Sequence, residues 1–285
     1  MSNILVTGSD GQLGNEFRQL APKSKENRYY FTDVEELDIT DLSAIRDFVL
    51  KYEIKVVINC AAYTNVENAE DNYAAANRIN NEAVKNLALA CKEYDACLIH
   101  VSTDYVFQGN GNLPYKEDDS TEPIGVYGQT KLAGEQAILD IVCSHLIFRT
   151  AWLYSSFGNN FVKTILRLSS DKEQINVIFD QVGTPTYAGD LAILIFDITE
   201  ERLYLNHQGI YHFSNEGVCS WYDFAQEIVT HSGNMCKVLP CYTNQFPSKV
   251  KRPIFSVLDK GKVKADFNYE IPYWKESLVK CIKLL

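Results

Sequence analysis

The chain has 285 residues, of which 46% are hydrophobic and 22% charged, and its formal net charge is -10. These values are typical of a globular protein with one large domain or two closely packed ones. The acidic balance argues against nucleic-acid and anionic-membrane partners, which need a basic surface, and no apolar run approaches the ~20 residues that span a bilayer.

Strands and helices alternate over the first 150 residues. Hydrophobic patterning predicts strands at 3–7, 28–33, 55–61, 96–102 and 144–150, and helices at 12–20, 41–52, 73–94 and 127–139. Strands that are apolar almost throughout, such as 55–61, suit a parallel sheet buried on both faces. The order therefore predicts an α/β fold with a doubly wound parallel sheet of the Rossmann type.

The alternation weakens after residue 150. Strands are expected at 175–179 and 209–213, helices at 188–199, 220–231 and 271–285, and a loop at 245–254. We therefore predict a dinucleotide-binding domain over 1–150 and a smaller, mixed α/β substrate-binding region over 151–285. This region should close over the carboxyl ends of the strands, where ligands of such sheets bind, and the chain can cross back to the first domain.

The eight cysteines form no Cys-x-x-Cys pair and no close Cys/His cluster. We expect reduced, mostly buried thiols in a cytoplasmic protein, and no metal site. The N-terminus also lacks a charged segment followed by a long apolar one, so we expect no secretory signal.

A glycine-rich turn follows the first predicted strand. Gly8, Gly11 and Gly14 are spaced Gly-x-x-Gly-x-x-Gly and lead into a helix. Glycines let a backbone approach a pyrophosphate closely, and a helix N-terminus offers free N–H groups. Asp33 lies 19 residues after Gly14, where an acid can accept hydrogen bonds from a ribose. The alternative for the glycines is an ordinary tight turn, and the alternative for Asp33 is a solvated acid at a strand end. Asp33 favours NADH, although NADPH remains open.

A Tyr-x-x-x-Lys pair, Tyr127 and Lys131, begins a later helix. The two side chains share one helix face, and a lysine cation would lower the pKa of the tyrosine toward the range that acid–base chemistry needs. Thr103 and Ser102, at the end of a predicted strand, could donate a hydroxyl to the same carbonyl oxygen. Without that upstream pair, a solvated helix face would be the simpler interpretation.

Longer motifs carry a family resemblance. They lie at residues 8–14, 59–64, 102–107, 127–131, 149–154, 158–162, 180–186, 252–253 and 256–259. In these segments the chain resembles the extended short-chain dehydrogenases/reductases, and within them the dTDP-4-dehydrorhamnose reductases. The resemblance implies NADPH- or NADH-dependent reduction of the C4 keto group of dTDP-6-deoxy-L-lyxo-4-hexulose to dTDP-L-rhamnose, a precursor of cell-surface polysaccharides.

The resemblance also implies roles for individual residues. Tyr127 would be the proton donor, Lys131 its partner and Thr103 a contact to the carbonyl. The expected dinucleotide contacts are Gly8, Gly11, Gln12, Leu13, Gly14, Asp33, Asp38, Ile39, Ala62, Tyr63, Thr64, Tyr127 and Lys131. The dTDP-sugar would meet Thr103, Asp104 and Trp152.

The chemistry of two residues, Trp152 and Arg252, also suits substrate binding. Trp152 offers an apolar face to a deoxysugar, although a core tryptophan is an open alternative. Arg252 could clamp a diphosphate, with an ordinary charged loop as the alternative.

The resemblance also bears on metal binding and assembly. Some relatives form a dimer around a metal held by glutamates. Glu16 matches one such position, but Gly189 stands at another, so no metal is expected here. A homodimer without the metal remains an open assembly.

Two competing functions remain. Sugar-nucleotide dehydratases follow the catalytic threonine with Asp-Glu, whereas here Asp104 is followed by Tyr105; the related epimerase-reductases carry a nearby cysteine that is missing. The regulatory subunit of methionine adenosyltransferase also resembles these reductases and acts as a partner. The presence of Tyr127, Lys131 and Thr103 favours an enzyme.

Overall fold

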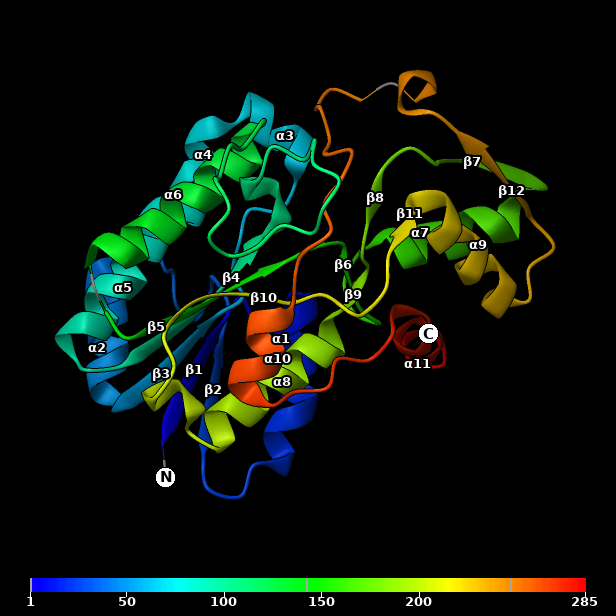
Figure 1. Cartoon of the computed structure of the whole chain (residues 1–285). Helices are drawn as coiled ribbons and strands as arrows, with labels where there is room; N and C mark the ends of the chain where they lie inside the picture. Colours follow the sequence, from blue (N-terminus) through cyan, green and yellow to red (C-terminus); the bar gives the residue numbers. More distant parts are fainter. Residues whose placement is uncertain (1, 142, 247) are drawn as a thin grey trace.

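A six-stranded parallel sheet forms the centre of the larger lobe in the computed structural model, which describes residues 2–141, 143–246 and 248–285 (Figure 1). The strands lie in the order β10–β5–β4–β3–β1–β2, and every neighbouring pair is parallel. Their bounds are β1 (Asn3–Thr7), β2 (Arg28–Thr32), β3 (Ile54–Asn59), β4 (Cys97–Thr103), β5 (His145–Thr150) and β10 (Gly209–His212). The doubly wound parallel sheet predicted from the sequence is confirmed.

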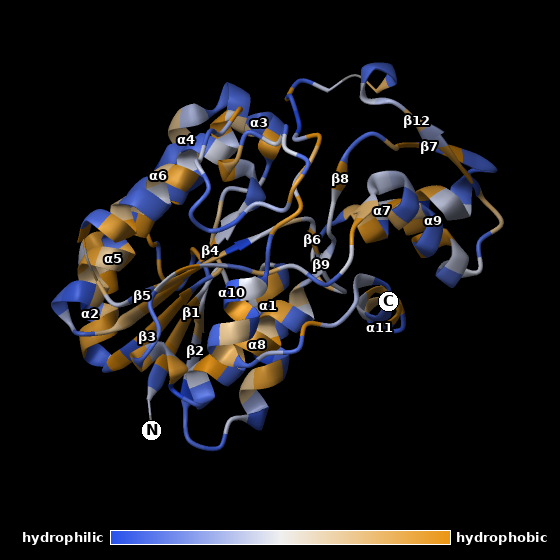
Figure 2. Cartoon of the chain, in the orientation of Figure 1, coloured by the Kyte–Doolittle hydropathy of each residue, from blue (hydrophilic) through white to orange (hydrophobic). Residues whose placement is uncertain are grey.

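Helices cover both faces of this sheet (Figure 1). One layer contains α1 (Gln12–Leu20), α8 (Ala188–Glu200) and α10 (Gly261–Phe267); the other contains α2 (Leu42–Lys51), α5 (Ala83–Glu93) and α6 (Val126–Ile141). Strand side chains alternate between the layers: Ile4 and Val6 pack against the first, and Leu5 packs against the second. This alternation explains the continuous apolar runs, which Figure 2 shows as hydrophobic strands in the middle of the molecule.

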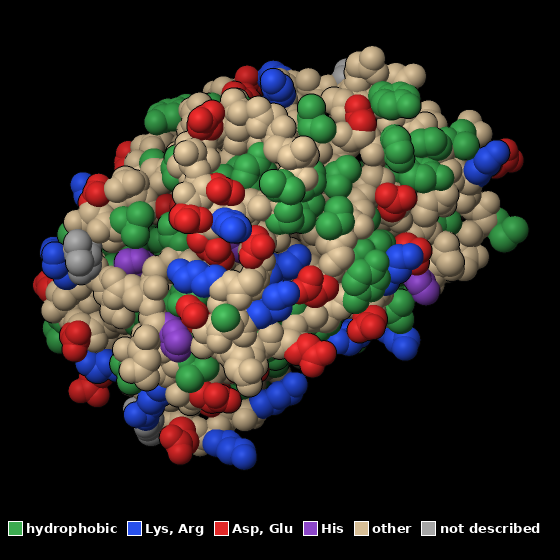
Figure 3. Space-filling view, viewed as in Figure 1, with side chains coloured by type: hydrophobic (Ala, Val, Ile, Leu, Met, Phe, Trp, Pro, Cys, Tyr) green, Lys and Arg blue, Asp and Glu red, His purple; other side chains and the backbone are tan. Residues whose placement is uncertain are grey.

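A smaller lobe has its own core. Its parallel pair, β7 (Gln174–Ile178) and β12 (Lys237–Cys241), packs with α7 (Phe161–Asp171), α9 (Trp221–Ser232) and α11 (Trp274–Ile282). Two short pairs complete it: β6 (Leu153–Tyr154) with β9 (Thr186–Tyr187), and β8 (Val182–Gly183) with β11 (Cys219–Ser220). In Figure 3, hydrophobic side chains gather in the upper right part of the view, on the side of the smaller lobe. Acidic and basic side chains are interspersed over the lower part of the view.

The C-terminal half of the chain contributes to both lobes. β10 pairs with β5 at the edge of the large sheet, and α8 packs against α1. The connections include the short helices η1 (Ala21–Lys23), η3 (Asp104–Val106), η4 (Leu203–Leu205) and η5 (Thr243–Gln245). Within the described residues, none of the helices has the length and hydropathy needed to cross a bilayer.

Several elements differ from the sequence prediction. The single helix expected at 73–94 is three segments: α4 (Tyr73–Asn77), the π-helical turn η2 (Arg78–Glu82) and α5. A Cβ atom at Gly134 of α6 would lie 2.1 Å from the carbonyl oxygen of Asn80, so α6 packs directly onto this turn. The prediction also missed α3 (Val66–Asp71), α7, β12 and α10. Three of these four are at most seven residues long, which is too short for a clear periodic pattern.

Candidate active site

The glycine-rich turn joins β1 to α1 at the carboxyl edge of the sheet. Gly8 has a φ of +64°, and a Cβ atom there would lie 2.5 Å from the backbone nitrogen of Ala61. A Cβ atom at Gly14 would lie 2.5 Å from the carbonyl oxygen of Gly8. Gly11 caps α1 and has no side chain to occupy the free N–H groups of the first turn. The turn is therefore shaped to hold a pyrophosphate.

A hollow of about 320 Å³ opens beside this turn. Asp33 Oδ2 accepts a hydrogen bond from the backbone N–H of Asp10 at 3.1 Å, and Oδ1 accepts one from Val34 at 2.8 Å. The Thr40 backbone amide lowers the pKa of Asp38, so this carboxylate is charged at neutral pH. The predicted residues that line this hollow are Gly8, Gly11, Asp33, Asp38, Ile39, Ala62 and Tyr63. Its acids and its neighbouring turn suit an adenosine ribose.

A second hollow, the cleft, has a volume of about 600 Å³ and lies between the two lobes. It shares Gly11, Cys60 and Ala62 with the first, so together they make one elongated depression. The predicted residues that line the cleft are Gly11, Gln12, Leu13, Ala62, Thr64, Thr103, Asp104, Tyr127, Lys131 and Trp152. Gly14 is buried beneath the turn. The structure thus brings most of the predicted cofactor and substrate residues to one depression.

One face of α6 carries Tyr127, Lys131 and Glu135 at intervals of four residues. The Glu135 carboxylate accepts hydrogen bonds from the Arg149 guanidinium of β5, with Nη2 and Oε2 separated by 2.7 Å, and from the Ser102 hydroxyl of β4. Ser102 lines the cleft, but its hydroxyl donates to Glu135. Its expected hydrogen bond to the substrate carbonyl stays a prediction and would require the hydroxyl to turn away from Glu135.

The two α6 side chains are buried to different degrees: Tyr127 is partly buried, and Lys131 is 1% exposed. Burial lowers the pKa of Lys131 to about 8, opposed by the Glu135 charge. Lys131 Nζ donates to the Val101 carbonyl oxygen at 2.7 Å. Burial raises the pKa of Tyr127 to about 12, opposed by a hydrogen bond with Thr103. This rise is opposite to the lowering that we expected from Lys131, because burial is the larger influence here.

Thr103 and Asp104 form a hydrogen-bonded pair at the end of β4. Thr103 Oγ1 donates to Asp104 Oδ1 at 3.0 Å and accepts from the Tyr105 backbone N–H at 3.2 Å. Burial raises the pKa of Asp104 to about 6, opposed by hydrogen bonds from Thr103 and Ser256. To donate to a substrate carbonyl, the Thr103 hydroxyl must turn its proton away from Asp104.

Trp152 lies in the cleft as part of an aromatic stack. Its indole is parallel to that of Trp221, with ring centroids 3.5 Å apart and planes 9° apart. A Cβ atom at Gly183 would lie 2.7 Å from Trp152 Cε2, which gives a structural reason for glycine in the 180–186 motif. Trp152 also has a φ of +49°, an uncommon value for a bulky residue. The partly buried ring lines the cleft, unlike a core tryptophan.

Arg252 lies outside the residues that line the cleft. Its Nη2 is 3.4 Å from Glu67 Oε1. Burial raises the pKa of Tyr105, a cleft residue, and the Arg252 charge opposes this rise. Arg252 is therefore close to the cleft but contacts a carboxylate of α3. Its predicted role as a diphosphate clamp stays a prediction.

Glu16 and Gly189 stand at the positions that were compared with metal-binding relatives. The Ser155 hydroxyl donates to Glu16 Oε1 at 2.6 Å, and burial raises the pKa of Glu16. A Cβ atom at Gly189 would lie 2.5 Å from the ring of Tyr187, so a larger side chain would not fit there without movement. Within the described residues, no group of three or more His, Cys, Asp or Glu side chains is arranged to hold a metal ion.

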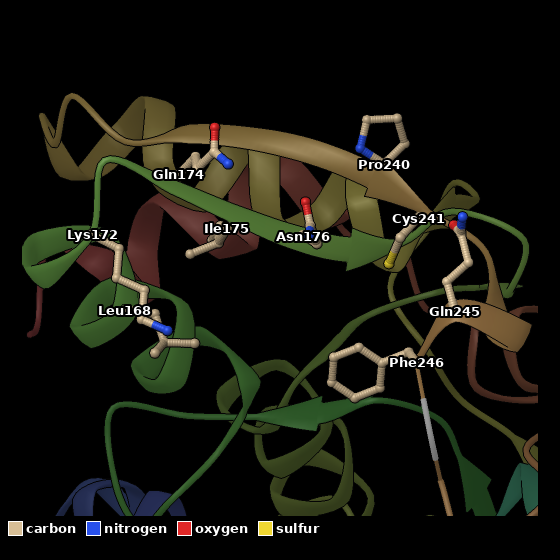
Figure 4. A pocket seen from close by; sticks show the side chains of 9 residues that line it. All are labelled: Leu168, Lys172, Gln174, Ile175, Asn176, Pro240, Cys241, Gln245 and Phe246. Atoms are coloured by element: carbon tan, nitrogen blue, oxygen red, sulfur yellow. The ribbon is translucent and has the colours of Figure 1, made fainter.

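A third hollow, of about 720 Å³, lies on the smaller lobe, away from these residues (Figure 4). It is lined by Leu168, Lys172, Gln174, Ile175, Asn176, Pro240, Cys241, Gln245 and Phe246. Lys172 and Cys241 are the ionisable side chains among these described residues, and burial raises the pKa of Cys241. This lining lacks the acid–base groups of the cleft.

The sequence analysis gave no role to several cleft residues. Asn160 Nδ2 donates to Gln12 Oε1 at 3.0 Å, while its Oδ1 caps α7 by accepting from the Lys163 backbone N–H at 3.1 Å. An asparagine before an amphipathic helix is a capping signal that could have revealed α7. Tyr105 also lines the cleft and meets the Tyr127 ring edge-on at 5.5 Å; the sequence carries no comparable signal for this contact.

With this geometry described, the chain can be compared with known proteins. The family model for the RmlD substrate binding domain matches residues 1–285. The chain belongs to this family. The resemblance to dTDP-4-dehydrorhamnose reductases is therefore confirmed.

Individual members of the family match over nearly their full lengths. The dTDP-4-dehydrorhamnose reductase of Aggregatibacter actinomycetemcomitans is 37% identical, over 98% of this chain and 97% of the relative. A crystal structure of a dTDP-4-dehydrorhamnose reductase from Clostridium acetobutylicum is 43% identical, with a TM-score of 0.93 and 99% of both chains covered. The reductase of Bacillus anthracis, in complex with NADP, is 37% identical, with a TM-score of 0.94 and 100% of both chains covered.

Removing the charge of Glu135 should destabilise the protein strongly. Glu135→Gln leaves the Arg149 cation buried without a counter-charge, so we expect the free energy of unfolding to fall by about 3 kcal/mol in urea denaturation. Glu93→Gln is the matched control: its pair with Arg46 has 42% and 43% exposed side chains, against 3% and 1% for Arg149 and Glu135. The control should lose less than about 1 kcal/mol. Equal losses in the two variants would contradict this interpretation.

The raised pKa of Asp104 predicts a pH-dependent stability. The unfolded chain releases this proton near pH 3.8, whereas the folded protein keeps it up to about pH 6. The folded state binds more protons between these values, so the carboxyl lowers stability as pH rises through them. Asp104→Asn cannot titrate, and its stability relative to wild type should rise by about 2.4 kcal/mol between pH 4 and pH 7.5. A difference that stays constant across urea titrations at both pH values would refute the assignment.

Proposed function

We propose that this chain catalyses NADPH- or NADH-dependent reduction of the C4 keto group of dTDP-6-deoxy-L-lyxo-4-hexulose, giving dTDP-L-rhamnose. The observation that carries the proposal is the meeting of Thr103, Tyr127 and Lys131 in a cleft that continues into the glycine-rich turn. A dinucleotide held by that turn can therefore extend to the three side chains. Family membership over the whole chain supports the same reaction.

The proposed chemistry divides between cofactor and protein. The reduced nicotinamide supplies a hydride when bound. Tyr127 gives its phenolic proton to the C4 oxygen, and Thr103 donates a hydrogen bond to the same oxygen once it turns from Asp104. Lys131 lies one helical turn from Tyr127, so its charge can stabilise the phenolate that remains.

The geometry leaves room for either cofactor. The Asp33 carboxylate in the adenosine hollow suits the ribose hydroxyls of NADH. Arg18 lies close by, with Nη2 3.0 Å from Asp10 Oδ1, and Asp10 in turn donates its backbone N–H to Asp33. The Arg18 guanidinium could neutralise the 2′-phosphate of NADPH. The Bacillus anthracis relative was solved in complex with NADP.

The substrate is proposed to enter from the smaller lobe. Residues 1–150 would hold the dinucleotide and 151–285 mainly the dTDP-sugar, with Trp152 facing the deoxysugar, Asp104 beside it and Arg252 reaching the diphosphate. The Tyr105 ring stands against Tyr127, where a dehydratase would carry a second acid. This contact favours reduction over water elimination. The homodimer and the cytoplasmic location stay predictions.

The reductase assay uses the 4-keto sugar nucleotide with NADPH or NADH and follows absorbance of the reduced nicotinamide. Wild-type protein should consume cofactor, and Tyr127→Phe should lower kcat at least about 100-fold because the proton donor is lost. Cofactor affinity by titration should be nearly unchanged. Tyr73→Phe, at a residue that is 55% exposed on α4, is the control and should behave as wild type. Absence of turnover with both cofactors would rule out the reductase function.

Asp33 should set the preference between cofactors. Asp33→Asn removes the negative charge beside the ribose, so kcat/KM for NADPH relative to NADH should rise about tenfold, or ~1.4 kcal/mol. Glu35→Gln is the control, because Glu35 is exposed on the same loop but does not line the hollow. An unchanged ratio in Asp33→Asn would show that this carboxylate does not face the 2′ position.

A further inference from the structure

A row of buried polar side chains crosses the large sheet and ends at Lys131. Thr7 of β1, Asn59 of β3 and His100 of β4 are direct neighbours in the strand register, and each is at most 1% exposed. Thr7 Oγ1 lies 2.7 Å from Asn59 Oδ1, and Asn59 Nδ2 lies 3.0 Å from His100 Nδ1. Burying a polar group costs free energy unless its hydrogen bonds are made. Each side chain in the row therefore restricts the orientation of the next one.

The orientation of the Asn59 amide is set by the backbone. The N–H of Ala61 can only donate, and it lies 3.2 Å from Asn59 Oδ1. The oxygen of the amide therefore faces Ala61 and Thr7, and the NH₂ group faces His100. Because that NH₂ group can only donate, His100 Nδ1 must accept and carries no proton. A neutral His100 then has its proton on Nε2.

The Nε2 proton meets the candidate catalytic lysine. Lys131 Nζ lies 3.2 Å from His100 Nε2 and 2.7 Å from the carbonyl oxygen of Val101. An ammonium has no lone pair, so it would face the His100 Nε2–H donor with donors of its own. An uncharged amine can accept a hydrogen bond from the Nε2–H and still donate one to Val101. The other charge that acts on Lys131 is Glu135, one turn along α6, which Arg149 neutralises. The contact thus favours the uncharged amine.

We propose that His100 is a positioning residue that holds Lys131 in place and stabilises its uncharged amine form through the fixed row Thr7–Asn59–His100. The pKa values agree: burial lowers that of Lys131 to about 8 and that of His100 well below its ordinary value. Its role in the reaction rests on the proposed reductase function. After Tyr127 has given its proton to the substrate oxygen, the Lys131 ammonium returns a proton to the phenolate and becomes the amine, and solvent then restores the ammonium.

The tautomer of His100 can be measured without substrate or cofactor. The chain has five histidines, and ¹⁵N-histidine spectra distinguish the Nε2–H from the Nδ1–H form. We expect the His100 ring to stay in the Nε2–H form from pH 6 to pH 9, with no titration. Lys131→Met should shift its Nε2 resonance and leave the tautomer unchanged. An Nδ1–H ring, or titration within this range, would overturn the proposal even if the protein proves to be a reductase.

The resonance of His100 can be assigned in two ways. His100→Gln removes it directly. If that variant does not fold, single His→Gln changes at the other four histidines assign it by elimination.

The pH dependence of turnover tests the effect on Lys131. In His100→Gln the side-chain carbonyl can accept from the Lys131 ammonium, so the alkaline limb of the kcat profile should move to higher pH by at least about 0.5 unit. His231→Gln, on α9 and remote from the cleft, should keep the wild-type limb. A purely structural role for His100 would lower thermal stability without moving the limb. A limb that superimposes on wild type in a folded His100→Gln variant would contradict the proposal.

Discussion

The buried ion pair between Glu135 and Arg149 fixes the helix on which the candidate catalytic residues lie. Arg149 comes from β5, and Ser102 of β4 donates to the same carboxylate, so α6 is attached to two adjacent strands at once. Lys131 and Tyr127 follow on the same face, one and two turns toward the N-terminus. Their positions over the strand ends therefore depend on a contact that itself takes no part in chemistry.

The parallel sheet explains why residues distant in sequence meet at one place. The carboxyl ends of β1, β3 and β4 lie at one edge, and the segments that follow them supply the glycine-rich turn, Ala62 to Thr64, and Thr103 with Asp104. The connection from β2 to β3 crosses back over β1, which makes the gap between β1 and β3 a topological switch point. Ligands of doubly wound sheets bind at such points. The smaller lobe completes the cleft with Trp152, which packs on Trp221.

Periodic features were predictable from the sequence and contacts between elements were not. The bounds of β1 and α1 agree with the pattern because turn glycines and hydrophobic periodicity are local signals. The pKa of Tyr127 depends on how deeply the ring is buried, and the tautomer of His100 depends on an amide from another strand. Neither can be read from spacing along the chain.

Strand β10 has a consequence for how the protein is made. β5 is buried along its whole length, yet its outer neighbour is β10, which ends at His212, roughly three quarters of the way along the chain. On a ribosome, which adds about 5–20 residues per second, the nascent chain would display the open, apolar edge of β5 for several seconds before its partner emerges. Unpaired apolar edges invite association between chains. The yield of folded protein in a cell should therefore depend on how quickly translation passes this interval, and on chaperones that shield the edge meanwhile.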